Sequence, residues 1–135
     1  MLTYYKSSLS VFAGILFFTV IACAQQPSGF HSIRADEFKE MLSKDSGAVL
    51  DVRTPGEYQS GHITQALSLD ITQSDFEEQI KKLDMDKTYY VYCRSGNRSS
   101  RASAIMTKLG FKKVINIKDT IDHILQSGVP VSKGE

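Results

Sequence analysis

The chain has 135 residues, of which 41% are hydrophobic, and this length and composition suit one domain with a hydrophobic core. Its 16 basic and 15 acidic residues nearly balance, which gives no support to nucleic-acid binding. The sequence has only two cysteines, too few for a cysteine-based zinc site, and the three histidines show no metal-ligand spacing. We therefore expect no metal site.

Residues 1–22 are predicted to be a signal peptide. A polar start containing Lys6 precedes an apolar run over residues 11–22, which is short for a membrane span and typical of the core of a signal peptide. Residues 20–23, Val-Ile-Ala-Cys, resemble the bacterial lipoprotein cleavage box, in which the cysteine is lipidated and becomes the first residue. An ordinary secretory signal and an uncleaved anchor are the alternatives.

Lipidation at Cys23 would give three parts: a signal peptide over 1–22, a polar tether over 23–29 and a domain over 30–135. The lipid would hold the domain at a membrane of the cell envelope, on the periplasmic or extracytoplasmic side. Lys6 is the only charged residue that precedes Cys23, so 15 basic and 15 acidic residues would remain. Cys93 would be the only thiol left, and no disulfide could form within the processed chain.

The first half of the domain alternates short strands and helices. Residues 30–33 are predicted to form a strand, and residues 35–43 a helix with an apolar face, followed by a stop at 45–47. A second strand is expected over 48–52. Pro55 suits the first turn of a short helix that ends at Gly61.

The same alternation continues downstream. We expect a strand over 66–69, a helix over 75–83 with Ser74 as its N-cap, a strand over 113–117 and a helix over 120–126. Such alternation is typical of an α/β fold around a mainly parallel sheet, in which ligands bind at the carboxyl ends of the strands.

The most informative stretch is residues 88–101. A buried strand is predicted over 88–92, Cys93 follows it directly, and a turn over 94–97 leads into a helix that Gly110 stops. The apolar face of this helix consists of Ala102, Ile105, Met106 and Leu109.

The position of Cys93 favours a reactive thiolate, because a helix N-terminus offers free N–H groups and partial positive charge. Arg94, Arg98 and Arg101 lie at the helix end where cations are unfavourable, which indicates an anion site. The alternative is a small buried hydrophobic residue and a solvated face of arginines.

Residues 93–99, Cys-Arg-Ser-Gly-Asn-Arg-Ser, resemble the active-site loop of single-domain rhodaneses, a family of sulfurtransferases. Residues 51–58, Asp-Val-Arg-Thr-Pro-Gly-Glu-Tyr, followed by Gly61, His62 and Ile63, resemble the upstream motif of that family. The resemblance covers approximately residues 30–131. It implies an α/β sandwich with a mainly parallel five-stranded sheet and helices on both faces.

The resemblance also implies a reaction. Cys93 would attack the outer sulfur of a small anionic donor such as thiosulfate, and a thiol or cyanide acceptor would discharge the resulting persulfide. The loop would bind the substrate through Arg94, Ser95, Gly96, Asn97 and Arg98. Asp51, Arg53, Glu57 and His62 would support the loop structurally, and no metal or organic cofactor is implied.

Two other functions stay open. A non-catalytic sulfur carrier or interaction module is the first alternative. A cysteine phosphatase or arsenate reductase is less favoured, because only four residues separate Cys93 from Arg98 and those enzymes have five.

The chain also departs from the family pattern. It has Asp119-Thr120 in place of two glycines, Ile124 in place of a tryptophan and Thr64-Gln65 in place of Pro-Gly. If Asp119 faces the loop, its charge would disfavour the thiolate and weaken activity with thiosulfate.

Overall fold

The computed structural model describes residues 29–134. The predicted signal peptide, Cys23 and most of the tether lie outside the described residues. The described elements are β1 (His31–Ile33), α1 (Ala35–Lys44), β2 (Ala48–Asp51), α2 (Pro55–Ser60), β3 (His62–Ile63), β4 (Leu67–Ser68), α3 (Phe76–Ile80), β5 (Thr88–Tyr92), α4 (Asn97–Lys108), β6 (Lys113–Ile117), α5 (Ile121–Gln126) and β7 (Val131–Ser132). Within residues 29–134, no helix is both long enough and apolar enough to cross a bilayer.

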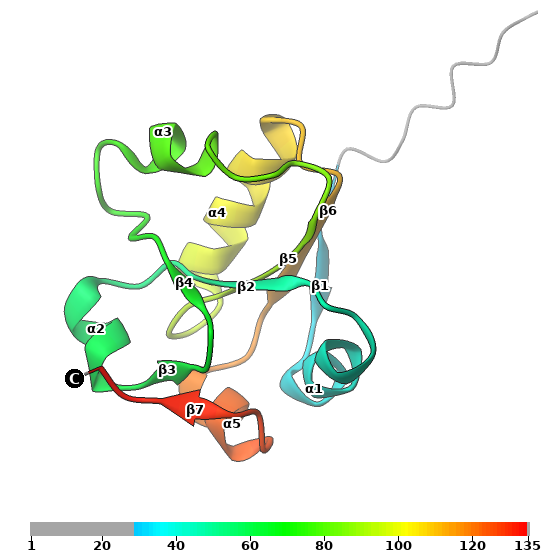
Figure 1. The fold of residues 1–135 in the computed structure, drawn as a ribbon, viewed down its shortest axis with the longest axis vertical. Coiled ribbons are helices and arrows are strands. Elements are labelled where there is room, and N and C mark those ends of the chain that lie inside the picture. Colours follow the sequence, from blue (N-terminus) through cyan, green and yellow to red (C-terminus); the bar gives the residue numbers. More distant parts are fainter. Residues whose placement is uncertain (1–28, 135) are drawn as a thin grey trace, which may run out of the picture.

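Five strands form one sheet in the order β1-β6-β5-β2-β4, and every neighbouring pair is parallel (Figure 1). β5 therefore lies at the centre, with β6 on one side and β2 on the other. This arrangement confirms the predicted α/β fold with a five-stranded parallel sheet. The antiparallel pair of β3 and β7 was not predicted, because two-residue strands carry no periodicity.

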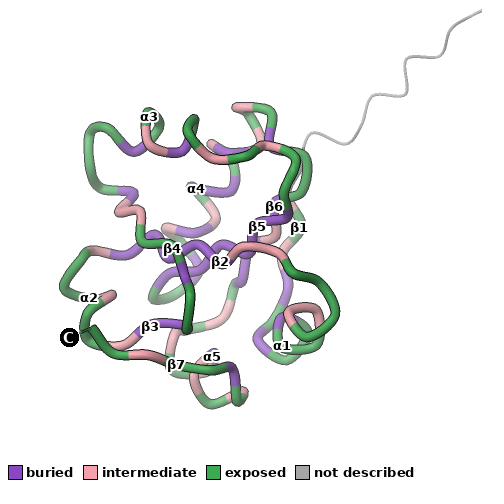
Figure 2. Tube along the Cα trace, viewed as in Figure 1, coloured by how far each residue is buried: buried purple, intermediate pink, exposed green. Residues whose placement is uncertain are grey.

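Helices cover both faces of the sheet, as predicted (Figure 1). One core, made with α3 and α4, receives Tyr89, Val91 and Cys93, and the other, made with α1 and α5, receives Tyr90 and Tyr92. Successive side chains of β5 thus alternate between the two cores. Figure 2 shows β5 as a continuous buried segment, so every residue of the strand that leads to Cys93 is packed inside the domain.

The prediction for the helix before β5 was wrong in its boundaries. α3 begins at Phe76 and ends at Ile80, and its N-cap is Asp75 rather than Ser74, without a side-chain capping bond. The preceding turn is organised instead by Asp70, whose carboxylate accepts hydrogen bonds from the amide and hydroxyl of Thr72. Leu83 still packs against the core from the turn after α3, which explains its apolar character.

Candidate active site

Cys93 follows the last residue of β5, at the edge of the sheet where the parallel strands end. The Tyr92 carbonyl accepts a hydrogen bond from the Val52 amide at 3.1 Å, which extends the pairing of β2 and β5 to the start of the loop. The exposed fraction of Cys93 is 0%. The sulfur is thus held inside the molecule where the sequence predicts it, between a strand and a helix N-terminus.

The loop after Cys93 depends on a glycine at position 96. Gly96 is the N-cap of α4 and has φ 87°, a left-handed conformation that side chains disfavour. A Cβ atom there would lie 2.8 Å from the backbone oxygen of Lys118. The close approach of the chain after β6 and the curl of the loop therefore both require glycine.

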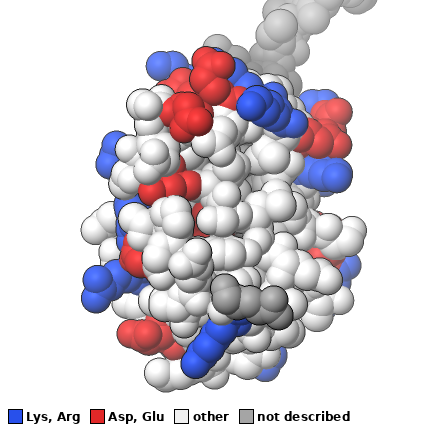
Figure 3. Space-filling view, turned by 60° about the vertical axis from the view of Figure 1, so that its left-hand side comes forward, with Lys and Arg blue, Asp and Glu red and all other residues white. Residues whose placement is uncertain are grey.

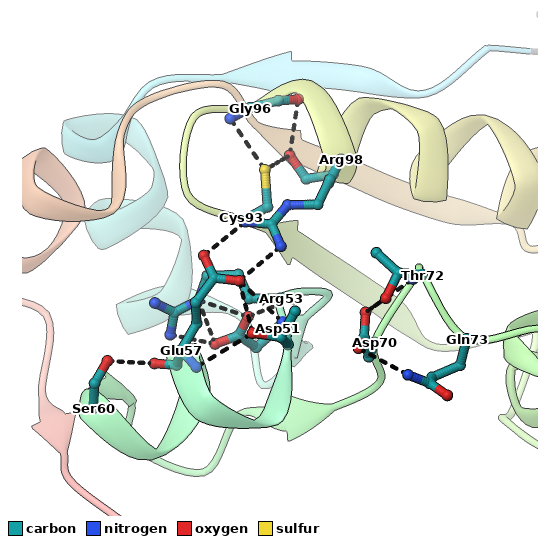
Figure 4. Close-up of polar contacts among 12 residues, drawn as sticks. Asp51, Arg53, Glu57, Ser60, Asp70, Thr72, Gln73, Cys93, Gly96 and Arg98 are labelled. Carbon is teal, nitrogen blue, oxygen red and sulfur yellow. Dashed lines mark hydrogen bonds and ion pairs between the residues drawn. The ribbon is translucent and has the colours of Figure 1, made fainter.

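Two polar groups contact the sulfur atom, the Gly96 amide and the Ser99 hydroxyl (Figure 4). The Gly96 amide donates to Sγ at 3.2 Å, and the Cys93 thiol donates to Oγ of Ser99 at 3.5 Å. The Ser99 hydroxyl in turn donates to the Gly96 carbonyl at 3.1 Å. When Cys93 loses its proton, the Ser99 hydroxyl is placed to turn and donate to the thiolate.

The environment lowers the pKa of Cys93 below its ordinary value. Burial of the side chain raises the pKa, but hydrogen bonds outweigh that effect: from the Ser99 side chain, and from the amides of Ser99, Ser95 and Gly96. The donors of the loop and of the first turn of α4 thus favour the charged form of the sulfur, which is the form that acts as a nucleophile.

The polar residues of the loop divide into two groups. Arg94, Ser95 and Asn97 are exposed. Arg98 instead forms a bidentate ion pair with Glu57, in which its two terminal nitrogens each lie 2.7 Å from one carboxylate oxygen. The structure thus places Arg94 and Arg98 at the loop, but the guanidinium of Arg98 is already bonded to a carboxylate. Arg101, the third arginine of the predicted anion site, is exposed in the second turn of α4.

Glu57 is fixed from its own helix as well. It occupies the third position of α2, where its carboxylate accepts from the Thr54 amide at 3.1 Å while the Thr54 hydroxyl accepts from the Glu57 amide, a complete capping box. The hydrogen bond from Arg98 is the main cause that lowers the pKa of Glu57 to about 2. The carboxylate is therefore charged near neutral pH.

A buried polar network lies beneath the loop, around Asp51 and Arg53. Arg53 donates to Oδ2 of Asp51 from its terminal nitrogen at 2.6 Å and to the Gly61 carbonyl at 2.7 Å. The Tyr92 hydroxyl donates to the same carboxylate at 2.6 Å and accepts from the Ile63 amide at 3.2 Å. This network ties β2, β5 and the segment around β3 together just below Cys93, and burial beside Asp51 raises the pKa of Tyr92.

His62 is buried and belongs to the supporting structure around α2. Its Nδ1 lies 2.9 Å from the Tyr58 carbonyl, and its ring stacks on the Tyr58 ring with centroids 3.7 Å apart. The hydrogen bonds described for Cys93 do not involve it. This geometry agrees with the structural role that the resemblance implies.

Asp119 does not point toward the Cys93 loop. Its Oδ2 accepts from the Ala35 amide at 2.8 Å, at the first residue of α1, and its Oδ1 lies 3.8 Å from Arg34. The hydrogen bond from Ala35 leads the causes that lower the pKa of this carboxyl. Thr120 is the N-cap of α5 and accepts from the His123 amide. Asp119 and Thr120, which stand in place of the two glycines, thus accept hydrogen bonds from the first turns of α1 and α5.

The other departures from the family pattern have structural places of their own. Ile124 is fully buried in the core beside α1. Thr64 and Gln65 follow β3, where the Thr64 hydroxyl bonds that of Ser132 in the strand segment of β7. Gln65 has φ 64°, a conformation that glycine adopts more readily.

Sequence reasoning missed two residues of the site, Ser99 and Tyr92. Ser99 occupies the third position of α4, six residues after Cys93, and a serine in a first helical turn usually signals only a cap or a solvated position. Tyr92 was assigned to a buried strand without a polar role. The cue that was available is chemical, since a buried tyrosine hydroxyl needs a hydrogen-bond partner.

The comparison with known protein families identifies the family of this chain. Residues 34–126 match the model of the rhodanese-like domain. The chain belongs to the rhodanese-like family. The match includes β2, α2, the Cys93 loop and α4, and therefore both motifs that carry the resemblance in the sequence.

Individual relatives agree with this family. The chain is 33% identical over 95 residues to the putative sulfur carrier protein YrkF of Bacillus subtilis, covering 70% of this chain and 50% of that protein. It is 35% identical over 89 residues to a putative mitochondrial thiosulfate sulfurtransferase of Schizosaccharomyces pombe, covering 58% and 63%. The chain thus spans less than two thirds of either relative.

The fold of a solved rhodanese-like domain is similar too. The solution structure of such a domain from Anabaena sp. superposes with a TM-score of 0.68 at 25% sequence identity, covering 76% of this chain and 78% of that one. The five-stranded parallel sheet with helices on both faces is therefore the rhodanese fold.

Proposed function

We propose that the protein is a sulfurtransferase in which Cys93 carries the transferred sulfur as a persulfide. One observation supports this most: the sulfur lies against the loop N–H groups, at a strand end, with its pKa lowered. Backbone donors that favour a thiolate also favour an anionic persulfide at the same place.

The proposed reaction has two steps. With thiosulfate, the Cys93 thiolate bonds to the outer sulfur while the bond between the two thiosulfate sulfurs breaks, and its electron pair leaves with sulfite. With cyanide, the carbon bonds to the outer sulfur of the persulfide, and the thiolate of Cys93 is released along with thiocyanate. Each step conserves charge and needs no further oxidant or reductant.

The decisive test is to load the purified protein with thiosulfate and measure its intact mass. We expect one added sulfur atom in the parent protein and none after Cys93→Ser, a nearly isosteric change. Cyanide should remove the added sulfur and yield thiocyanate. Equal sulfur transfer by the parent and the Cys93→Ser protein would refute the assignment.

A sulfur carrier is the second candidate, supported by the relative that is named a putative sulfur carrier and by the complete burial of Cys93. A carrier would load once and pass its sulfur to a specific partner, whereas an enzyme releases many equivalents of thiocyanate. Steady-state assays with excess donor and cyanide separate the two functions.

The phosphatase alternative has less support. Such an enzyme needs its loop arginine to bind phosphate, and both terminal nitrogens of Arg98 are bonded to Glu57. Hydrolysis of a generic aryl phosphate is a direct check, and we expect none above background.

We also propose that Cys23 is lipidated and anchors the domain at the cell envelope, on the periplasmic or extracytoplasmic side. The support is the sequence of residues 20–23 and the polar residues after them. Membrane fractionation of a Cys23→Ala protein tests it. If the variant stays as membrane-bound as its parent, the apolar segment itself is the anchor.

A further inference from the structure

Arg98 is surrounded by groups that carry or can carry negative charge. Arg98 contacts Glu57 through both of its terminal nitrogens, and the side chains are only 24% and 28% exposed. The hydrogen bond to Glu57 is the main cause that raises the pKa of Arg98, and the charges of Glu57, Cys93 and Asp70 add to it. Arg98 therefore lies among three groups that carry or can carry negative charge (Figure 4).

Both carboxylates of this group are locked in their charged form. Glu57 has a pKa of about 2 and is held by the capping box of α2. Burial raises the pKa of Asp70, but hydrogen bonds from Thr72 and Gln73 prevail and lower it. Protonation near neutral pH therefore cannot remove the negative charge of either carboxylate from the surroundings of Arg98.

The positive charge left for a donor lies on exposed arginines, where water screens it. Arg94 and Arg101 are exposed, and among residues 29–134 neither takes part in an ion pair within 4.0 Å. Figure 3 brings the side of α2 and α3 forward and shows a broad uncharged area with charges of both signs around its margin. A donor with two negative charges would enter beside a thiolate and two carboxylates, while the guanidinium of Arg98 is already bonded to Glu57 and the charges of Arg94 and Arg101 are exposed to solvent.

We propose that the Glu57–Arg98 ion pair determines donor specificity: it disfavours dianionic donors such as thiosulfate and favours an alkyl persulfide. This inference rests on the proposed function, because it concerns the donor of the same reaction. Glu57 acts through Arg98 and is a positioning residue.

The chemistry of the favoured donor fits this charge balance. The Cys93 thiolate bonds to the outer sulfur of R–S–SH while the bond between R–S and that sulfur breaks. The electron pair leaves with R–S⁻, and the proton stays on the transferred sulfur. Only one negative charge is present throughout, so the two carboxylates oppose this reaction less than the reaction of a dianion.

The test compares three donors that differ in charge: thiosulfate with two negative charges, benzenethiosulfonate with one, and the persulfide of 2-mercaptoethanol generated in situ, whose reacting protonated form R–S–SH carries none. Glu57→Gln keeps a carbonyl oxygen for Thr54 but removes the charge that neutralises Arg98. We expect kcat/KM to rise about threefold per unit of donor charge, which is about tenfold for thiosulfate, with the persulfide unchanged within about twofold.

The matched control is Glu77→Gln. Glu77 is an exposed carboxylate of α3 outside the ion pairs of the described residues, so its change removes the same charge without affecting Arg98. We expect the three kcat/KM values to stay at parent levels. If Glu57→Gln changes all three donors by one common factor, the role of Glu57 is structural and the inference is wrong.

A measurement on the parent protein tests the same idea without any variant. If carboxylates repel thiosulfate, added salt screens that repulsion, so kcat/KM should rise with ionic strength, more steeply for thiosulfate than for benzenethiosulfonate. A fall with salt would overturn the inference. Failure of all three donors to load sulfur on Cys93 would instead overturn the proposed function itself.

Discussion

The carboxylate of Asp119 joins two distant parts of the chain, and its removal tests how the fold is held together. It accepts from the Ala35 amide at 2.8 Å across 84 positions of sequence, and its side chain is 13% exposed. It satisfies a free N–H group at the start of α1, where no side-chain capping bond comes from the N-cap residue Arg34. We predict that Asp119→Ala destabilises the protein while leaving the Cys93 thiolate unaffected.

The expected loss in the free energy of unfolding follows from the contacts that the Asp119 carboxylate makes. A hydrogen bond to a charged group contributes about 1.5–3 kcal/mol, and a negative charge at a helix start about 0.3–1 kcal/mol. The contacts with Arg34 at 3.8 Å and with Nδ1 of His123 at 3.3 Å add little, because those side chains are 61% and 43% exposed. We expect a loss of about 2 kcal/mol for Asp119→Ala. For Asp119→Asn, which keeps a neutral acceptor, we expect about 1 kcal/mol.

Thermal and urea unfolding followed by circular dichroism measure this loss. For a domain of this size, about 2 kcal/mol corresponds to a fall in Tm of about 10 °C. Because the folded state lowers the pKa of Asp119, its contribution is complete above the unfolded pKa of about 3.9 and is lost as the pH falls through the folded value. The difference between parent and variant should therefore shrink in acid.

Asp122→Asn is the matched control, since Asp122 is an exposed carboxylate in the first turn of α5. It should cost less than about 0.5 kcal/mol. Thiolate absorbance titration of Cys93 supplies the second readout, and we expect the same curve for parent and Asp119→Ala. A loss of stability below about 0.5 kcal/mol would refute the role of Asp119 in holding α1. A lower pKa of Cys93 in the variant would show that the carboxylate acts on the loop.

Two further predictions concern the loop itself. Ser99→Ala removes the largest hydrogen-bond contribution to the lowered pKa of Cys93, so the thiolate titration and the acid limb of the pH–rate profile should both move to higher pH. Ser103→Ala is its control, because Ser103 is buried on the same helix and its Oγ has no hydrogen-bond partner among the described residues; an equal shift in both variants would contradict the role of Ser99. Gly96→Ala should destabilise the protein by about 2 kcal/mol or more, because it combines a strained φ with a contact at 2.8 Å to the Lys118 carbonyl. Gly56→Ala has open space around its Cβ and should be neutral or slightly stabilising; denaturant unfolding that ranked the two glycines in the opposite order would refute the geometry of the loop.

Much of the fold could be predicted from the sequence because its elements have strong local signals. The strand over residues 88–92 combines β-branched and aromatic residues, and the helix after Cys93 has a regular apolar face, so both were located within one or two residues. The boundary errors occurred where the local signal is weak. Leu83 continued the apolar pattern of α3, yet it packs on the core from a turn, which periodicity alone cannot distinguish from another helical turn.

The site was harder to predict than the fold, because its charges depend on pairs that are far apart in sequence. Arg98 and Glu57 are separated by 41 positions, and Asp119 and Ala35 by 84. The sequence predicts that Arg98 lies in the first turn of a helix. It does not show that a carboxylate from another helix binds both terminal nitrogens of Arg98. The balance of charges around Cys93 therefore depends on the tertiary structure and could not be predicted from the sequence.

These pairings imply that the Ser99 hydroxyl and the backbone amides, rather than the arginines, stabilise negative charge on sulfur. The amides that lower the pKa of Cys93 belong to Ser95, Gly96 and Ser99, and their positions are fixed by the curl of the loop and the first turn of α4. Salt screens exposed side-chain charges strongly, whereas buried amide dipoles keep their effect on an adjacent buried atom. A sulfur held in this way can be a thiolate without a free cation beside it, which leaves Glu57 and Arg98 to act on the donor rather than on the nucleophile.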